Sequence, residues 1–209
     1  MKHLFVIFLF LILQSCSESK ISVNADEIAQ DSLILDSHID VPYRLWSQHL
    51  EGLEIDDISG PTNGDFDFIR ARKGGLNVPF FSIYLPASTE EDGTSHKMAN
   101  DLIDMVEDVV TLHPEKFLLI KSVDDLSSLT NKNKVGIALG MENGAPIQGD
   151  LSRVGYYYDR GIRYITLTHS KTNHISDSSY DENIQWHGLS EFGKTLIEEM
   201  NRGGIMIDI

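Results

Sequence analysis

Cysteine and positive charge are both scarce in this sequence. The first shortage excludes an intramolecular disulfide, and the second argues against a nucleic-acid partner. The chain has 1 cysteine, Cys16, so no intramolecular disulfide can form and the core must hold by packing alone. Lys and Arg together number 17 against 32 Asp and Glu, which gives a formal net charge of −15. A surface this acidic repels phosphate backbones, so we expect no nucleic-acid partner.

Two common catalytic motifs are also missing. The sequence contains no glycine-rich phosphate loop and no Gly-x-Ser-x-Gly segment that would present a serine nucleophile. The single cysteine is assigned below to a lipid anchor, which leaves no thiol for catalysis.

The long apolar run of this chain lies at its N-terminus. Lys2 precedes an unbroken run over Leu4–Leu13, which is too short to cross a bilayer as a helix but suits the core of a secretory signal. The tetrapeptide Leu-Gln-Ser-Cys that ends at Cys16 resembles a bacterial lipobox. We therefore predict a lipoprotein signal peptide over 1–15, lipid attachment at Cys16 and a flexible tether over 16–25. The protein would be extracytoplasmic, anchored to a bacterial membrane on its periplasmic side or at the cell surface. An ordinary signal peptide with an incidental cysteine is the alternative.

From residue 26 onward, short apolar runs alternate with segments of helical period. This alternation is typical of βα units around a parallel sheet. We expect strands at residues 33–35, 78–85, 135–141, 163–168 and 205–209, with 117–120 as a short strand outside the main sheet. Expected helices lie around 66–73, over 98–112, from an Asp150 cap to Gly161, and from a Ser190 cap to Gly203-Gly204. The sequence predicts an α/β fold, an incomplete β/α (TIM-type) barrel over 26–209 with about five of the eight strands of such a barrel.

The last apolar segment leads to an expectation about length. The chain ends inside the strand expected at 205–209, directly after a helix. A natural terminus normally lies at the surface, so we expect the sequence to be an N-terminal fragment. A protein that ends on its final strand is the alternative. With two open sheet edges, this polypeptide alone is expected to aggregate or fold poorly.

Side chains that commonly bind metals follow three of the expected strands. His38 and Asp40 come after the first strand, Glu142 after residues 135–141, and His169 after residues 163–168. In a β/α barrel the C-terminal strand ends meet at one mouth, where active sites form. His38 and Asp40 are two residues apart, so on an extended backbone they point to the same side and can bind one metal ion. Imidazole plus carboxylate suits zinc, and a further carboxylate can bridge two ions.

Each of these residues also has an interpretation without function. The backbone could satisfy an isolated His38, Glu142 could cap a helix or form a core ion pair, and His169 could hydrogen-bond a loop. Their shared placement at strand ends favours the metal site. Four other histidines are left out for want of a partner carboxylate or because a loop would expose them: His49, His96, His113 and His174. The role of Asp208 stays open.

Four separated stretches then match one known family in order. They are Asp36–Tyr43 (DSHIDVPY), Gly140–Gly144 (GMENG), Arg163–His169 (RYITLTH), and the segments 188–193, 200–202 and 206–209. Together they resemble the membrane (renal-type) dipeptidases from about Ser32 to the last residue. Asn143 stands where that family commonly has glycine, and Pro79 departs from the sequence pattern of many relatives. Neither difference removes a metal ligand.

The resemblance implies a zinc metallohydrolase that cleaves dipeptides at a centre of two zinc ions. His38 and Asp40 would bind the first zinc, Glu142 would bridge both, and His169 would contact the substrate and stabilise its developing oxyanion. Further ligands, a substrate-binding arginine and an acid/base aspartate would come from strands after Ile209. The implied partners are a dipeptide, the membrane through the N-terminal lipid, and a second copy of the chain in a homodimer. Alternatives are another metal-dependent amidohydrolase acting on cyclic amides or esters, and an inactive lipoprotein that uses the barrel only to bind.

Overall fold

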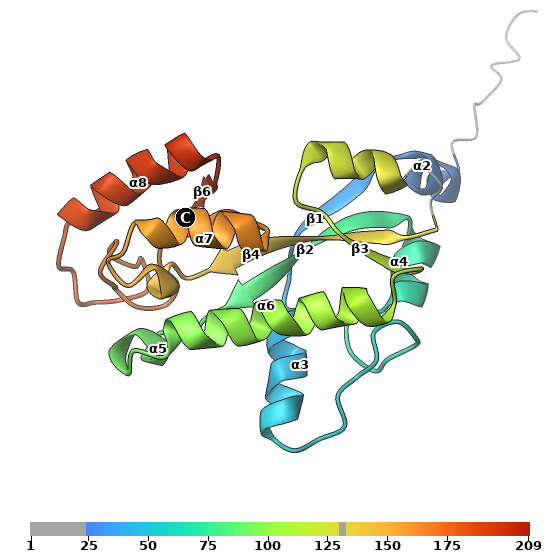
Figure 1. Cartoon of the computed structure of the whole chain (residues 1–209), viewed down its shortest axis with the longest axis horizontal. Helices are drawn as coiled ribbons and strands as arrows, with labels where there is room; N and C mark the ends of the chain where they lie inside the picture. The colour runs from blue at the N-terminus through green and yellow to red at the C-terminus, as the bar shows by residue number, and fades with distance from the viewer. Residues whose placement is uncertain (1–23, 130–132) are drawn as a thin grey trace, which may run out of the picture.

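Parallel strands form the centre of the molecule. The computed structural model describes residues 24–129 and 133–209, and within them a 6-stranded sheet has the main order β1-β2-β4-β5-β6. The strands are β1 (Ile34–Ile39), β2 (Leu76–Tyr84), β3 (Phe117–Leu119), β4 (Val135–Glu142), β5 (Ile162–Thr166) and β6 (Met206–Asp208). Every pairing is parallel, and β3 lies off the main order beside the start of β4, as predicted. The sheet and its helices form a half-barrel (Figure 1), which confirms the predicted fold class.

Helices connect the strands and cover one face of the sheet. They are α2 (Ala25–Asp31), α3 (Val41–Leu50), α4 (Phe68–Gly74), α5 (Ser88–Glu91), α6 (Ser95–Leu112), α7 (Ser152–Arg160) and α8 (Glu191–Gly203), with short 3-10 turns η2 (Val123–Leu129) and η3 (Ala145–Ile147). Figure 1 shows α6 lying lengthwise along the strands. Across the described ranges, none of the helices combines the length and the apolar character that a membrane crossing requires.

Helix ends follow the capping chemistry that the sequence predicts. The Ser190 side chain accepts the Gly193 N–H at 2.9 Å and starts α8. Gly161 ends α7 at φ +109°, a conformation that side-chain-bearing residues rarely adopt. Asp150 accepts the Ser152 N–H at 3.0 Å, so its carboxylate does support the start of α7.

The structure adds helical residues near the start of the domain. No helix was expected over residues 41–50, but they form α3, and Pro42 lies in its first turn, where its missing N–H is not needed for a helical bond. Ala25, placed in the tether, is the first residue of α2, and the Asn24 side chain caps that helix. The predicted signal peptide, Cys16 and the rest of the tether lie outside the described residues.

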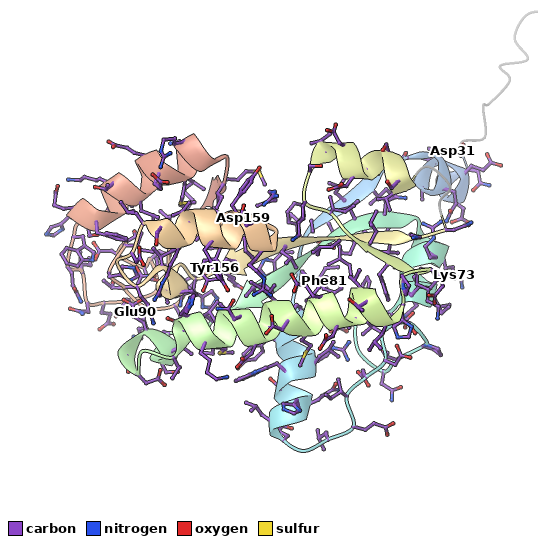
Figure 2. All side chains as sticks on the ribbon, viewed as in Figure 1. Asp31, Lys73, Phe81, Glu90, Tyr156 and Asp159 are labelled. Carbon is purple, nitrogen blue, oxygen red and sulfur yellow. The ribbon has the colours of Figure 1, made fainter. Side chains whose placement is uncertain are left out.

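The two faces of the sheet have different partners. Phe81 and Ile83 on β2, like Leu139 and Met141 on β4, are fully buried in the main core against the helices (Figure 2 labels Phe81). Alternate residues point to the opposite face, inside the half-barrel. A smaller apolar cluster that includes Val78 and Ala138 fills this inner face at the early part of the strands. The inner face near the strand ends is left to polar side chains.

A candidate metal centre and its cavity

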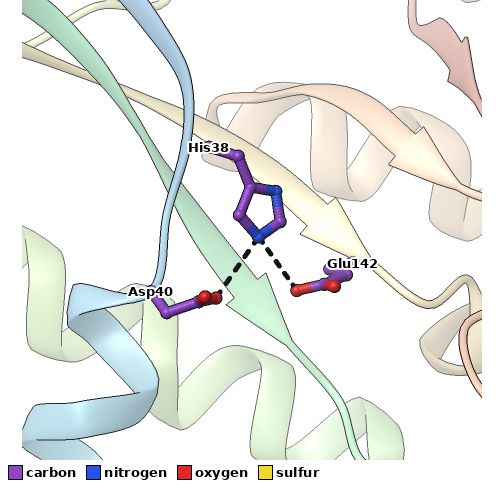
Figure 3. A group of neighbouring side chains, drawn as sticks. All are labelled: His38, Asp40 and Glu142. Atoms are coloured by element: carbon purple, nitrogen blue, oxygen red, sulfur yellow. Dashed lines mark ion pairs between the residues drawn. The ribbon is translucent and has the colours of Figure 1, made fainter.

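Three potential metal ligands meet at the ends of β1 and β4. His38 lies within β1 rather than after it, Asp40 occupies the N-cap position of α3, and Glu142 is the last residue of β4. One ligand atom of each lies within 4.8 Å of the others. His38 Nε2 lies 3.3 Å from Asp40 Oδ1 and 3.2 Å from Glu142 Oε2 (Figure 3).

These separations fit a zinc ion. Ligand atoms about 2.0–2.1 Å from a tetrahedral zinc lie roughly 3.3 Å from one another. The distances from His38 Nε2 to the two carboxylates match that spacing. The donor set of imidazole nitrogen and carboxylate oxygen is also one that zinc prefers.

Glu142 presents its two oxygens to opposite sides. Oε2 faces His38 and accepts a hydrogen bond from Ser82 Oγ at 2.9 Å, while Oε1 lies 3.2 Å from His169 Nε2. The Glu142 side chain is 15% exposed, so these contacts are partly shielded from water. A carboxylate placed in this way suits a bridging role. The sequence analysis did not single out Ser82. The only sign of its role was a small polar residue inside an otherwise apolar strand.

One hydroxyl contacts the His38 ring, and another holds the backbone of His169. Tyr164 Oη lies 3.0 Å from His38 Nδ1. Ser178 Oγ donates to the His169 carbonyl at 2.6 Å, and the Tyr84 ring lies edge-on to the His169 ring at 5.0 Å. His169 Nδ1 is buried and has no hydrogen-bond partner within residues 24–129 and 133–209.

Burial keeps the two tyrosines of this site neutral. It raises the pKa of Tyr84 above its usual value, and the neighbouring Tyr43 and the negative charges of Glu142 and Asp40 add to the rise. The pKa of Tyr164 is raised for the same first reason, burial, and then by nearby carboxylates. Both phenols therefore serve as neutral hydrogen-bonding groups at ordinary pH.

A cavity of about 550 Å³ opens beside these residues. His38, Glu142 and His169 form one wall, and the loop over residues 176–180 forms another. Asp208, whose role was left open, also lines the cavity and accepts a hydrogen bond from Thr166 Oγ1 at 2.5 Å.

Three of the four histidines that were left out have side-chain partners. His174 was expected to be exposed, but it is partly buried, and its Nδ1 lies 3.0 Å from Glu90 Oε1. His113 Nε2 lies 3.4 Å from Asp57 Oδ1, a carboxylate distant in sequence. His96 contacts a hydroxyl, that of Tyr157, at 2.7 Å. None of the three lines the cavity beside Glu142.

Comparison with known proteins decides the family. Residues 23–209 match the membrane dipeptidase family (Peptidase family M19). The chain belongs to the membrane dipeptidase family. It is 28% identical over 199 residues to Dipeptidase 3 of Mus musculus, covering 92% of this chain and 39% of that protein. It is 32% identical over 197 residues to an uncharacterized dipeptidase of Schizosaccharomyces pombe, covering 88% of this chain and 47% of that protein.

A solved structure agrees on the fold. The probable dipeptidase PvdM from Pseudomonas aeruginosa superposes with a TM-score of 0.74 at 24% identity, covering 88% of this chain and 48% of that one. The chain thus spans about half or less of the length of these relatives.

Membership in the membrane dipeptidase family confirms the resemblance found in the sequence. The structure also brings His38, Asp40, Glu142 and His169 to one place. Their individual roles as ligands and substrate contact stay predictions, as do lipidation at Cys16 and the homodimer.

Proposed function

We propose that the protein hydrolyses dipeptides outside the cytoplasm, using two zinc ions held in part by His38, Asp40 and Glu142. The single observation that carries the proposal is the convergence of one imidazole and two carboxylates within 4.8 Å at the ends of parallel strands. Family membership supports the reaction class, and the cavity beside the cluster supports a small substrate.

The chemistry that bound zinc supplies is Lewis acidity, which polarises a carbonyl and lowers the pKa of a water molecule towards neutrality. The residues of this chain have separate tasks around it. Ser82 fixes Glu142 through Oε2, so that the carboxylate keeps its other oxygen directed towards His169. His169 would donate an N–H to the substrate carbonyl oxygen as negative charge develops there.

The size of the cavity is compatible with a small-molecule substrate. Small-molecule sites commonly measure about 300–1,000 Å³. A cavity of about 550 Å³ is consistent with two amino-acid residues. The polar loop over 176–180, which also lines the cavity, would contact the substrate there.

Turnover by the full-length protein tests the proposal. Dipeptides should be cleaved in the presence of zinc, whereas cyclic amides and esters should not, which separates a dipeptidase from other amidohydrolases. Glu142→Gln should lower kcat/KM by more than about 100-fold, since even outer partners of metal ligands contribute 10–100-fold.

Glu90→Gln is the matched control for that variant. Glu90 is also partly buried and contacts a histidine at 3.0 Å, but it lies outside the cavity. Its kcat/KM should stay close to that of the wild-type protein. Undiminished dipeptide hydrolysis by Glu142→Gln would reject the proposed centre.

The location of the protein is a second part of the proposal. The lipobox-like segment that ends at Cys16 supports lipid attachment. Wild-type protein made in a bacterial host should incorporate radiolabelled fatty acid, and Cys16→Ser should not. A wild-type protein without the label, or a variant labelled as strongly as wild type, would contradict the anchor.

A further inference from the structure

Tyr164 reaches across the inside of the half-barrel to a proposed metal ligand. It lies on β5, is 7% exposed, and places its hydroxyl 3.0 Å from Nδ1 of His38 on β1. Strands β2 and β4 lie between these two strands in the sheet order. The contact therefore joins two strands that do not pair with each other.

Neighbouring residues leave the Tyr164 ring little freedom. Gly140 on β4 is its partner in register, and a Cβ at Gly140 would come within 1.9 Å of the ring. The ring of Phe80 on β2 lies 5.6 Å from that of Tyr164. Gly140 leaves room for the Tyr164 ring, and Phe80 packs beside that ring. The hydroxyl is thereby directed at His38.

The chemistry of imidazole gives this contact a direction. A neutral imidazole carries one proton, and a nitrogen that binds a metal ion must be the unprotonated one. His38 turns Nε2 towards Asp40 and Glu142 and turns Nδ1 towards Tyr164. When Nε2 binds a metal ion, the proton lies on Nδ1 and needs an acceptor, which the Tyr164 oxygen provides.

We propose that Tyr164 is a positioning residue that accepts the Nδ1–H of His38 and so holds Nε2 free and aimed for metal binding. This inference rests on the proposed function, in which His38 is a zinc ligand. Second partners of metal-binding histidines fix the tautomer and the ring orientation, and their loss commonly weakens metal affinity by about 10–100-fold.

Tyr164→Phe tests the inference, because it removes the hydroxyl and keeps the ring that fills the space at Gly140. The zinc Kd of the full-length protein is measured by competition with a chromophoric chelator. We expect it to rise by about 10–100-fold. Dipeptide turnover should recover when zinc is raised to saturation, since Tyr164 does not contact the substrate in this account.

Tyr157→Phe is a matched control from the same chain. Tyr157 is fully buried on α7, next to the Tyr156 labelled in Figure 2, and its hydroxyl lies 2.7 Å from Nδ1 of His96. It therefore loses the same chemical contact, a tyrosine hydroxyl on a histidine Nδ1, away from the metal centre. Its zinc Kd should equal that of the wild-type protein.

The outcomes separate this inference from the proposed function. If wild-type protein binds no zinc, or His38→Ala binds it as well as wild type, the proposed function fails. If wild type binds zinc and Tyr164→Phe binds it equally well, or both tyrosine variants weaken binding equally, only the role of Tyr164 is overturned. Should Tyr164→Phe not fold, the Nδ1–H proton of His38 in the zinc-loaded wild type decides by NMR: a slowly exchanging proton with a strong downfield shift supports its hydrogen bond to Tyr164, and a proton that exchanges freely with water overturns it.

Discussion

Replacing Asn173 by alanine should destabilise the loops that follow Glu142 and His169. Asn173 is 8% exposed and follows His169 in the loop after β5. Its side-chain nitrogen donates to the Leu167 carbonyl at 2.8 Å and to Asn143 Oδ1 at 3.2 Å. Its side-chain oxygen accepts the N–H groups of Ile175 at 2.8 Å and Ser176 at 3.0 Å.

Asn143, which accepts a hydrogen bond from Asn173, also contacts the end of a third strand, β2. Asn143, directly after Glu142, is 2% exposed and donates to the Leu85 carbonyl at 2.9 Å, beside the end of β2. Its φ of +82° is unusual for a residue with a side chain, although asparagine tolerates it better than most. The pair of amides thus connects the ends of β2, β4 and β5.

The magnitude follows from these contacts. Four hydrogen bonds are lost in Asn173→Ala. At about 0.5–1.5 kcal/mol each, the free energy of unfolding should fall by about 2–6 kcal/mol. Because several of the abandoned groups are buried, the upper half of that range is expected.

Urea unfolding of the full-length protein, followed by tryptophan fluorescence, measures this change. The midpoint should fall with an unchanged m-value. Asn100→Ala is the control: Asn100 joins α6 to α7 by accepting from Tyr156 and Arg160, but at a more exposed position. It should cost about 1 kcal/mol. A loss below about 1 kcal/mol for Asn173→Ala would refute the reasoning that buried amides hold these loops.

Three further changes probe the site and the fold. Ser82→Ala removes the 2.9 Å hydrogen bond to Glu142 and should weaken zinc binding by about 10-fold in a chelator titration, and an unchanged Kd would contradict this. Gly140→Ala drives a Cβ into the Tyr164 ring and should cost about 1–3 kcal/mol of unfolding free energy. A urea midpoint equal to that of wild type would show that the ring moves freely. Burial alone would raise the pKa of Asp67, but hydrogen bonds from the α4 backbone and from an arginine outweigh it and hold that pKa below its usual value. Because the folded pKa is lowered, the stability from Asp67 is present above pH 4 and is lost as the pH falls through the folded pKa, so acid titration of Asp67→Asn should show a smaller loss than wild type.

The strands and helix caps, which depend on residues close together in sequence, could be predicted from local patterns. The apolar run before Glu142 is β4, and Ser190 and Gly161 begin and end helices as capping chemistry requires. The strand ends also predicted that His38 and Glu142 would meet, because parallel strands present their C-terminal ends at one edge.

Other features depend on contacts between distant segments. His174 was taken for an exposed residue because its partner, Glu90, lies 84 residues earlier, on helix α5. The contact of Tyr164 with His38 crosses 126 positions, and nothing in the segment 163–169 marks its tyrosine as a partner of the first strand. Helix α3 was not expected for a different reason: Pro42 is compatible both with a break in the chain and with a first helical turn, and only the packing of α3 decides between them.

The zinc content of the purified full-length protein tests the central claim most directly. Metal analysis by mass spectrometry should find about 2 zinc ions per chain in wild type and in Glu90→Gln, because two-metal hydrolases hold a pair of ions. The same measurement on Glu142→Gln should find a clear loss. Wild-type protein that hydrolyses dipeptides without bound metal, or Glu142→Gln with full zinc content, would contradict the account.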